Sequence, residues 1–430
     1  MPAARVQEPG VPIEPEALRW AMRRAGVDET NLAKAVRVKS AETVRAWLRG
    51  QSRPTHSQTH KLARRLLVPF PILLLPPPKA ETELPLRDFR RGPRGQPSLE
   101  LRETVFDALR KRDWYREYRR EPNPLVGAFK EHDPLQAAQN IRMRLGLESW
   151  RQRPRSWSEF RSVFAKAIED RLDILVLMNS VLGNDTRRPL DAEEFAGFAL
   201  ADPIAPLIFV NTRGSVARSI FTMGHELGHI LIAENALDSD PLPDEDGSVE
   251  RWCDRFAAEL LMPREAFIAD WGSSPTRDLA ERCQELARRY HVSARAVLVR
   301  AREMSLIPRE LVRGIRDTLV AAETVEHSAA EGRGNFSTLV RVRNSRKLSE
   351  KILEATCDGA LSYTSAARLL NIRPSSLVAL LKRNRDRRHM PHDPRRRQRG
   401  DRIVPRCRVD HHSSRIRRFR SPGDGGSGMG

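Results

Sequence analysis

The sequence contains little cysteine and has no long hydrophobic run. Its four cysteines show no paired spacing; they are Cys253, Cys283, Cys357 and Cys407. This pattern argues against a disulfide framework, so we expect a reducing compartment, the cytoplasm. Neither a signal peptide nor a stretch of about 20 apolar residues is present, so we expect no membrane partner.

Acidic residues are too few to balance the basic ones. The chain has 75 Lys/Arg against 56 Asp/Glu, a net charge of +19, and residues 382–420 alone hold 16 Lys/Arg and 4 Asp, a net +12. Residues 384–430 contain few apolar residues and are expected to be a disordered, Arg-rich tail. Such a tail is either a solvated extension or a segment with non-specific affinity for nucleic acid.

An H-E-x-x-H motif stands at residues 225–229. On a helix, His225 and His229 lie one turn apart on the same face, where two imidazoles can hold one Zn²⁺. Glu226 lies about 100° around the helix and can take a proton from a metal-bound water. The alternative is a core helix with two hydrogen-bonded histidines, since the flanking residues are apolar.

A second helical pattern follows at residues 249–263 and ends at Pro263. Glu250 and Asp254 are four residues apart and share one face. A catalytic zinc commonly takes three protein ligands, and Glu250 is a good third one. Asp254 is placed to accept the free N–H of a zinc-bound histidine. The alternative is two ordinary charged residues at a helix edge.

The two motifs together, F-T-x-x-H-E-L-G-H and E-x-x-C-D-x-F-A-A-E-L-L-M-P, resemble those of the ImmA/IrrE family of bacterial metallopeptidases. The resemblance implies a gluzincin-like site that holds one Zn²⁺ per chain. It implies His225, His229 and Glu250 as ligands and Glu226 as the catalytic base. The family often has Ala-Asn where this chain has Cys253-Asp254, and an aspartate there is compatible with holding a histidine.

A buried strand is predicted at residues 207–211, with the apolar run at 172–178 as its neighbour. In zincins an edge strand lies beside the active-site helix and can bind a substrate backbone by strand addition. The donor that would stabilise the oxyanion is not placed by the sequence. Tyr290 and His291 are the nearest unexplained candidates, and packing or exposure to solvent explains them better.

Four helices are predicted in the N-terminal part of the chain, at residues 15–26, 28–38, 40–50 and 55–67. Residues 14–69 resemble the helix-turn-helix domain of XRE/Cro-type repressors. The resemblance makes Ser40–Arg49 the recognition helix. Residues 14–68 hold 12 Lys/Arg against 5 Asp/Glu, a net +7, which suits a phosphate backbone.

The predicted recognition helix has few side chains suited to reading bases. An alanine contacts only a thymine methyl, a glutamate accepts from cytosine N4, and Ser40, Arg45 and Arg49 suit phosphates. The expected DNA-contacting residues are Ser40, Ala41, Glu42, Thr43, Arg45, Ala46 and Arg49. Because base readout is expected to be weak, a protein-binding or dimerising module is the alternative.

The remaining sequence divides into linkers and helical segments. Two further helix-turn-helix patterns, at 286–298 and 365–377, are either packing hairpins, the favoured reading, or DNA contacts. The expected order is a disordered N-terminus (1–13), a helix-turn-helix domain (14–70), a Pro-rich linker (71–97), a helical connector (98–150), a metallopeptidase-like domain (151–320), a linker (321–335), a C-terminal helical region (336–383) and the tail (384–430).

We therefore expect an α+β, mostly helical chain. It has an N-terminal all-α helix-turn-helix bundle, a zincin-like domain of gluzincin type with a small sheet, and a helical C-terminal region. The resemblance implies an endopeptidase that cleaves a regulatory protein, often a repressor, in stress response or mobile-element control. The alternatives are a non-catalytic transcription regulator and an antitoxin-like binding protein. The carboxylate at Glu226 favours catalysis, and the sequence does not predict an oligomeric state.

Overall fold

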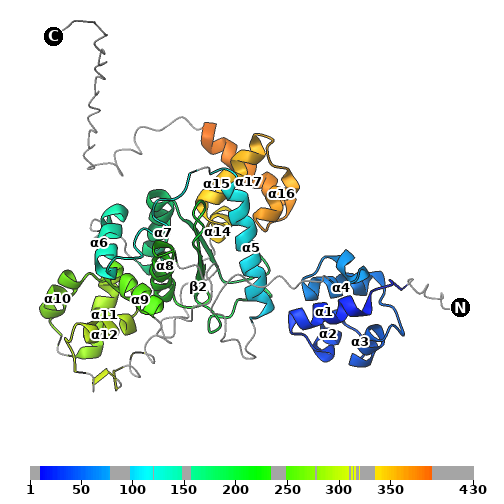
Figure 1. Ribbon diagram of the computed structural model, residues 1–430, viewed down its shortest axis with the longest axis horizontal. Coiled ribbons are helices and arrows are strands. Elements are labelled where there is room, and N and C mark those ends of the chain that lie inside the picture. Colours follow the sequence, from blue (N-terminus) through cyan, green and yellow to red (C-terminus); the bar gives the residue numbers. More distant parts are fainter. Residues whose placement is uncertain are drawn as a thin grey trace, which may run out of the picture. The chain divides into compact units, whose positions relative to one another are not determined.

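The computed structural model describes residues 10–77, 97–119, 121–147, 156–233, 248–276, 278–308, 311–312, 314–315, 319 and 335–389. Helices dominate these residues, together with one three-stranded sheet, which confirms the expected mostly helical α+β class (Figure 1). No described helix is long and apolar enough to cross a membrane. Most of the predicted N-terminal extension, both predicted linkers and the tail lies outside the described residues. The chain separates into two units, 1–381 and 382–430.

The N-terminal helices are α1 (Pro15–Ala25), α2 (Glu29–Val36), α3 (Ala41–Leu48) and α4 (His56–Leu66), followed by the 3-10 helix η1 (Phe70–Leu74). They enclose a core of their own, centred on fully buried leucines and Trp47. The side chain of Asp28 caps α2, whereas Ser40 precedes α3 without a side-chain capping bond. Leu73 is completely buried in this core, so the first part of the Pro-rich segment docks on the bundle.

The sheet consists of β1 (Leu175–Asn179), β2 (Gly197–Leu200) and β3 (Leu207–Asn211), in the order β1-β3-β2. The strands β1 and β3 are parallel, with Leu175 opposite Leu207, and β2 runs antiparallel to β3. The strand expected at 207–211 is present with its expected neighbour, but it is central. The strand at the edge beside α8 is β2, which sequence reasoning did not predict because Gly-Phe-Ala-Leu lacks β-branched residues.

Alternate strand residues face opposite layers of helices, as the period of two along a strand requires. One face packs against α7 (Trp157–Ala167), α8 (Val216–Leu231) and α9 (Ser248–Leu261) through Val176, Met178, Ala199, Ile208 and Val210. The other face packs against α5 (Leu99–Arg116) and the C-terminal helices through Leu175, Leu177, Phe198, Leu207 and Phe209. Figure 1 shows helices on both sides of the strands. Burial on both faces explains the continuous apolar runs in β1 and β3.

The other helices complete the two layers. The hairpin of α11 (Leu279–Tyr290) and α12 (Ala294–Glu303) buries its apolar residues in the same core as α8, so it packs, as favoured. The remaining elements are α6 (Pro134–Leu145), the π-helix η3 (Ile168–Leu172), α10 (Arg264–Ser273), α14 (Phe336–Arg343), α15 (Arg346–Cys357), α16 (Tyr363–Leu369) and α17 (Pro374–His389).

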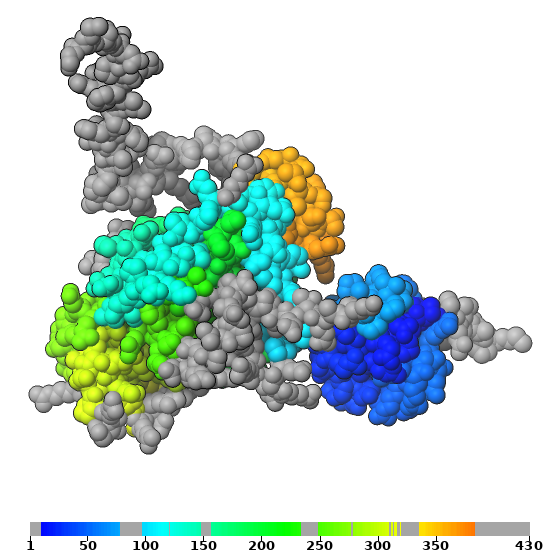
Figure 2. Space-filling model, viewed as in Figure 1, coloured from blue at the N-terminus to red at the C-terminus, as the bar shows by residue number. Residues whose placement is uncertain are grey.

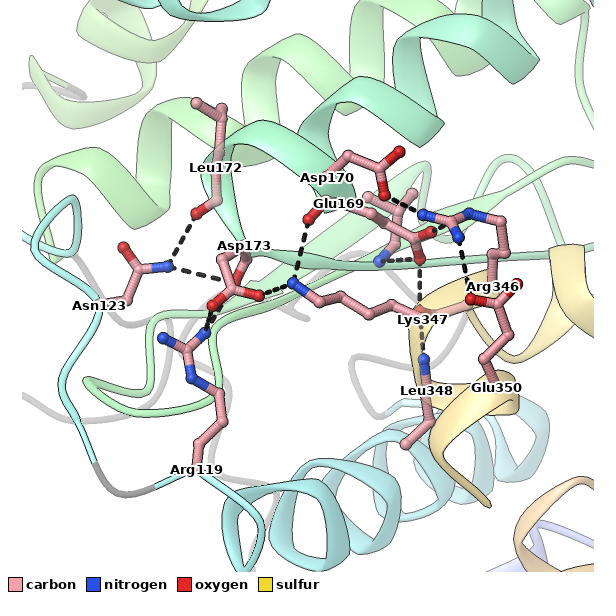
Figure 3. Close-up of polar contacts among 12 residues, drawn as sticks. Arg119, Asn123, Glu169, Asp170, Leu172, Asp173, Arg346, Lys347, Leu348 and Glu350 are labelled. Atoms are coloured by element: carbon pink, nitrogen blue, oxygen red, sulfur yellow. Dashed lines mark hydrogen bonds and ion pairs between the residues drawn. The ribbon is translucent and has the colours of Figure 1, made fainter. Parts of the chain in front are cut away.

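A polar junction fastens the C-terminal helices to the segment that precedes β1 (Figure 3). Ser345, fully buried with φ 63°, donates a hydrogen bond to the carboxylate of Glu169, which is only 3% exposed. Next to it, Arg346 pairs with Asp170, and Lys347 and Arg119 both pair with Asp173. Burial raises the pKa of Glu169, although the hydrogen bond from Ser345 and the charge of Arg346 oppose that shift.

Candidate metal centre

The helix α8 carries the H-E-x-x-H motif and is anchored by its apolar residues in the core on one side of the sheet. Ser215 caps its start by accepting a hydrogen bond from the backbone N–H of Arg218 at 3.1 Å. Ile220, Met223, Leu227, Ile230 and Leu231 are all fully buried. The imidazoles of His225 and His229 project from the remaining face, with their Nε2 atoms 3.1 Å apart. One turn of helix therefore sets the spacing of the two rings.

Glycines on α8 let α9 approach closely. A Cβ at Gly224 would lie 3.4 Å from the Cβ of Ala257, and a Cβ at Gly228 would lie 3.1 Å from Sγ of Cys253. Each glycine directly precedes a histidine of the motif. The close contact between α8 and α9 therefore lies next to the face of α8 that carries the two histidines. Cys253 is completely buried against Gly228, so its side chain takes part in the packing of the two helices.

The approach of α9 places Glu250 against both histidines. Its carboxylate oxygens lie 3.0 Å from Nε2 of His225 and 3.4 Å from Nε2 of His229. An ion with bonds of about 2.0–2.1 Å in tetrahedral geometry needs ligand atoms about 3.3 Å apart. The spacing of the two nitrogens and their distances to the carboxylate are close to this value, and two imidazole nitrogens with one carboxylate are a suitable donor set for a catalytic metal.

Asp254 approaches the far side of the first histidine. Its Oδ1 lies 2.9 Å from Nδ1 of His225, one helical turn beyond Glu250. This contact places the Nδ1 proton toward Asp254 and turns Nε2 toward the other donors. Burial alone lowers the pKa of His225, but its hydrogen bonds to Asp254 and Glu250 and the nearby carboxylate charges raise that pKa to about 10. Burial and the charge of His225 lower the pKa of His229.

Glu226 lies on the buried side of α8, next to the edge strand β2. Its side chain is 7% exposed, and burial is the main reason that its pKa is raised to about 7. A Cβ at Gly197 would lie 3.1 Å from Oε1 of Glu226 and 2.7 Å from both Thr222 and the carbonyl of Phe209. The edge strand thus abuts Glu226 only because residue 197 has no side chain. Sequence reasoning missed Gly197, since an isolated glycine gives no signal of a close approach.

Tyr290 and His291 are occupied by packing. The hydroxyl of Tyr290 donates to Asp270 at 2.7 Å, and the ring of His291 stacks on Phe160 with centroids 4.8 Å apart. Both residues are buried. Both side chains therefore have packing roles, and we assign neither to the metal centre.

The predicted DNA-contacting residues lie on α3 or directly next to its two ends. Ser40, Glu42, Arg45 and Arg49 are exposed, while the other three are half-buried: Ala41, Thr43 and Ala46. The carboxylate of Glu42 lies 3.2 Å from Arg45 and 2.7 Å from Arg49, and these hydrogen bonds lower its pKa. The acidic residue of the predicted recognition helix therefore neutralises part of its own basic face.

The candidate metal centre lies in a part of the chain that is similar to known proteins. Residues 169–302 match the peptidase family described as the IrrE N-terminal-like domain. The chain is also similar to the radiation response metalloprotease IrrE of Deinococcus radiodurans, with 36% identity over 116 residues. That match covers 25% of this chain and 34% of the relative, so the chain spans about a third of the length of the curated protein it matches. No solved structure shows a significant match. The region that holds His225, His229 and Glu250 is thus similar to metallopeptidases of the ImmA/IrrE family.

Proposed function

We propose that this protein is a zinc-dependent endopeptidase coupled to an N-terminal DNA-binding domain. The observation that carries the proposal is the placement of Glu226. This buried carboxylate lies in the H-E-x-x-H motif beside the three donors His225, His229 and Glu250. A site that only held a metal would not need that carboxylate, whereas hydrolysis needs a base next to the ion.

The residues of the site divide the work of peptide hydrolysis. A zinc ion held by the three donors supplies Lewis acidity, which lowers the pKa of water and polarises a peptide carbonyl. Glu226 accepts the proton of the attacking water and passes it to the leaving amine. In the metal-free chain burial raises the pKa of Glu226 to about 7, and a carboxylate that gains and loses a proton works best when its pKa lies near ambient pH. Asp254 keeps His225 in the required orientation.

The coupling to DNA rests on residues 14–70. Their charge is positive, and α3 presents Arg45 and Arg49 on its exposed side. A peptidase held at a promoter is well placed to cleave a regulatory protein bound there, so we propose a repressor-like protein as the substrate. The cytoplasm, where such a target would lie, stays a prediction.

Catalysis is tested by replacing Glu226 with glutamine in the full chain. Glu226→Gln should keep zinc, because residue 226 is not a ligand, and should lose cleavage. The measurement compares new protein N-termini, by terminal labelling and mass spectrometry, in cells that produce either the wild type or the variant. New termini that depend on Glu226 support the peptidase. If zinc is bound and the protein N-termini are identical in the two kinds of cell, the peptidase proposal is wrong. A non-catalytic regulator or an antitoxin-like binding protein would then be favoured.

DNA binding by the N-terminal domain is tested with Arg45→Gln/Arg49→Gln. If α3 contacts phosphates through these two side chains, the slope of log K against log salt should become shallower by about two. A matched change of Arg64→Gln/Lys61→Gln on α4 should alter the slope less. Equal slopes in the wild type and the α3 variant would favour the protein-binding or dimerising module.

A further inference from the structure

The turn between α16 and α17 repeats the turn between α2 and α3. After α2, Arg37 adopts φ 63° and the N–H of Val38 bonds to the carbonyl of Ala33 at 3.0 Å. After α16, Asn371 adopts φ 54° and the N–H of Ile372 bonds to the carbonyl of Ala367 at 2.9 Å. In both places a left-handed residue ends a short helix, and the next helix begins within a few residues.

The packing of the two helix pairs also corresponds. Ala33 and Ala367 are each 3% exposed, and each is followed by a second helix with fully buried anchors, Val44 in α3 and Leu377 in α17. The C-terminal pair turns its apolar side toward α5 and the sheet, where Leu377 and its neighbours join a shared core. Figure 2 shows these helices, in orange, beside the cyan atoms of α5. Their inner side is therefore already used in packing.

The outer side of the pair is basic. Arg368 in α16, Arg373 in the turn and Ser375 at the start of α17 are all exposed. Neither arginine forms an ion pair with any residue in the described part of the chain, whereas Arg45 and Arg49 of α3 share the carboxylate of Glu42. A packing hairpin does not require unpaired arginines on either side of its turn. Arg368 and Arg373 are instead placed to bind an anion from outside the chain.

The left-handed residue holds this turn in a fixed position. The side-chain amide of Asn371 donates to Asp107 of α5 at 2.8 Å, and the junction at Ser345 fixes the start of α15. Because these contacts lie on the inner side, the two arginines flank a turn that is anchored from behind. An anchored turn presents its charges at little cost in conformational entropy.

We propose that α16 and α17 form a second duplex-DNA contact, in which Arg368 and Arg373 hold backbone phosphates and the start of α17 faces the major groove. An α-helix fits the major groove of B-form DNA, whereas the deep, narrow major groove of duplex RNA excludes it. This contact goes beyond the DNA binding proposed for residues 14–70 and does not depend on it.

The test is the salt dependence of binding to a short duplex DNA of arbitrary sequence, with the full chain. Arg368→Gln/Arg373→Gln should make the slope of log K against log salt shallower by about two, because each lost phosphate contact removes about 0.9. The matched control Arg144→Gln/Arg264→Gln removes the same charge from exposed arginines on α6 and α10, which form no ion pair with any described residue. The control should leave the slope unchanged.

Three results would overturn the proposal: an unchanged slope in Arg368→Gln/Arg373→Gln, an equal loss in the control, or duplex RNA competing as well as duplex DNA. Thermal unfolding of each variant checks that it folds. If the double variant does not fold, Ser375→Asp provides a second test, since a carboxylate at the start of α17 should weaken binding several-fold. The variant Arg45→Gln/Arg49→Gln reports on the N-terminal domain separately, so failure of one contact is distinguishable from failure of the other.

Discussion

At the scale of single residues, the donors of the candidate centre also compete for a proton. His225 lies between Glu250 at 3.0 Å and Asp254 at 2.9 Å, and these carboxylates favour its charged form. A histidine must lose its proton from the coordinating nitrogen before it can bind a metal. The same carboxylates that orient the ring therefore make metal binding depend on pH.

The first prediction concerns this proton. Since the pKa of His225 in the metal-free chain is about 10, zinc binding at pH 8 should release about one proton. The apparent affinity for zinc should then rise by ~10-fold per pH unit below that pKa. Calorimetry in two buffers of different ionisation enthalpy measures the released proton. A release near zero at pH 8 would mean that His225 is already neutral before zinc arrives.

The second prediction concerns Asp254. Asp254→Asn removes the acceptor that holds the ring of His225, so zinc affinity should fall by ~10-fold to 100-fold while the fold persists. The matched control is Asp358→Asn, an exposed aspartate after α15. Competition with a fluorescent chelator measures both affinities. An Asp254→Asn affinity equal to that of the control would remove the positioning role.

Residue identity and spacing were sufficient to propose the donors but not all of their surroundings. His225 and His229 follow from helical periodicity, and Glu250 and Asp254 from their spacing and the family resemblance. Gly197 could not be predicted, because its importance lies in the close approach of β2 to Glu226, which is 29 residues away in the sequence. The pairing of Glu42 with Arg45 and Arg49 depends on side-chain conformation, which spacing alone does not determine.

At the scale of elements, the contact between α8 and α9 determines whether the third donor reaches the histidines. Gly228 faces Cys253 so closely that an added methyl group would lie 3.1 Å from Sγ and 3.3 Å from Cα. Either α9 moves or Cys253 rearranges. A shift of α9 would move Glu250 and Asp254 together, since both lie on that helix.

The third prediction follows from this contact. Gly228→Ala should weaken zinc binding by roughly 10-fold, as expected for a displaced outer contact of the site. The matched control, Gly272→Ala in α10, places its methyl group in open space and shares the gain in helix propensity. Chelator competition and thermal unfolding measure both variants. If Gly228→Ala binds zinc as tightly as the control, the close packing of α8 and α9 does not set the donor geometry.

At the scale of the whole molecule, the C-terminal helices are part of the folded body around the sheet. Their apolar residues cover the face formed by Leu175, Leu177 and Leu207, and the buried carboxylate of Glu169 ties Ser345 to η3. Sequence periodicity indicated these helices but not where they pack. The reason is that the runs in β1 and β3 are apolar on both faces. This pattern indicates that a layer of helices covers each face of the sheet, but it does not identify the helices in each layer.

The fourth prediction concerns the pH dependence of stability. Because burial raises the pKa of Glu169 in the folded state, the native chain binds this proton more readily than the unfolded one. The contribution of Glu169 to the free energy of unfolding therefore decreases as pH rises from the unfolded pKa of about 4.3 through the folded value. Glu169→Gln does not titrate, so its stability relative to the wild type should rise between pH 5 and pH 7. Denaturant unfolding at both pH values measures the difference, and a constant difference would contradict the prediction.

The most direct test of the central claim is the metal content of the purified full chain. Elemental mass spectrometry should find one zinc per chain in the wild type and in the control His132→Ala, an exposed histidine outside the donor set. It should find almost none in His225→Ala. Wild-type protein that holds no metal, even after zinc is added, would contradict a metal centre formed by His225, His229 and Glu250.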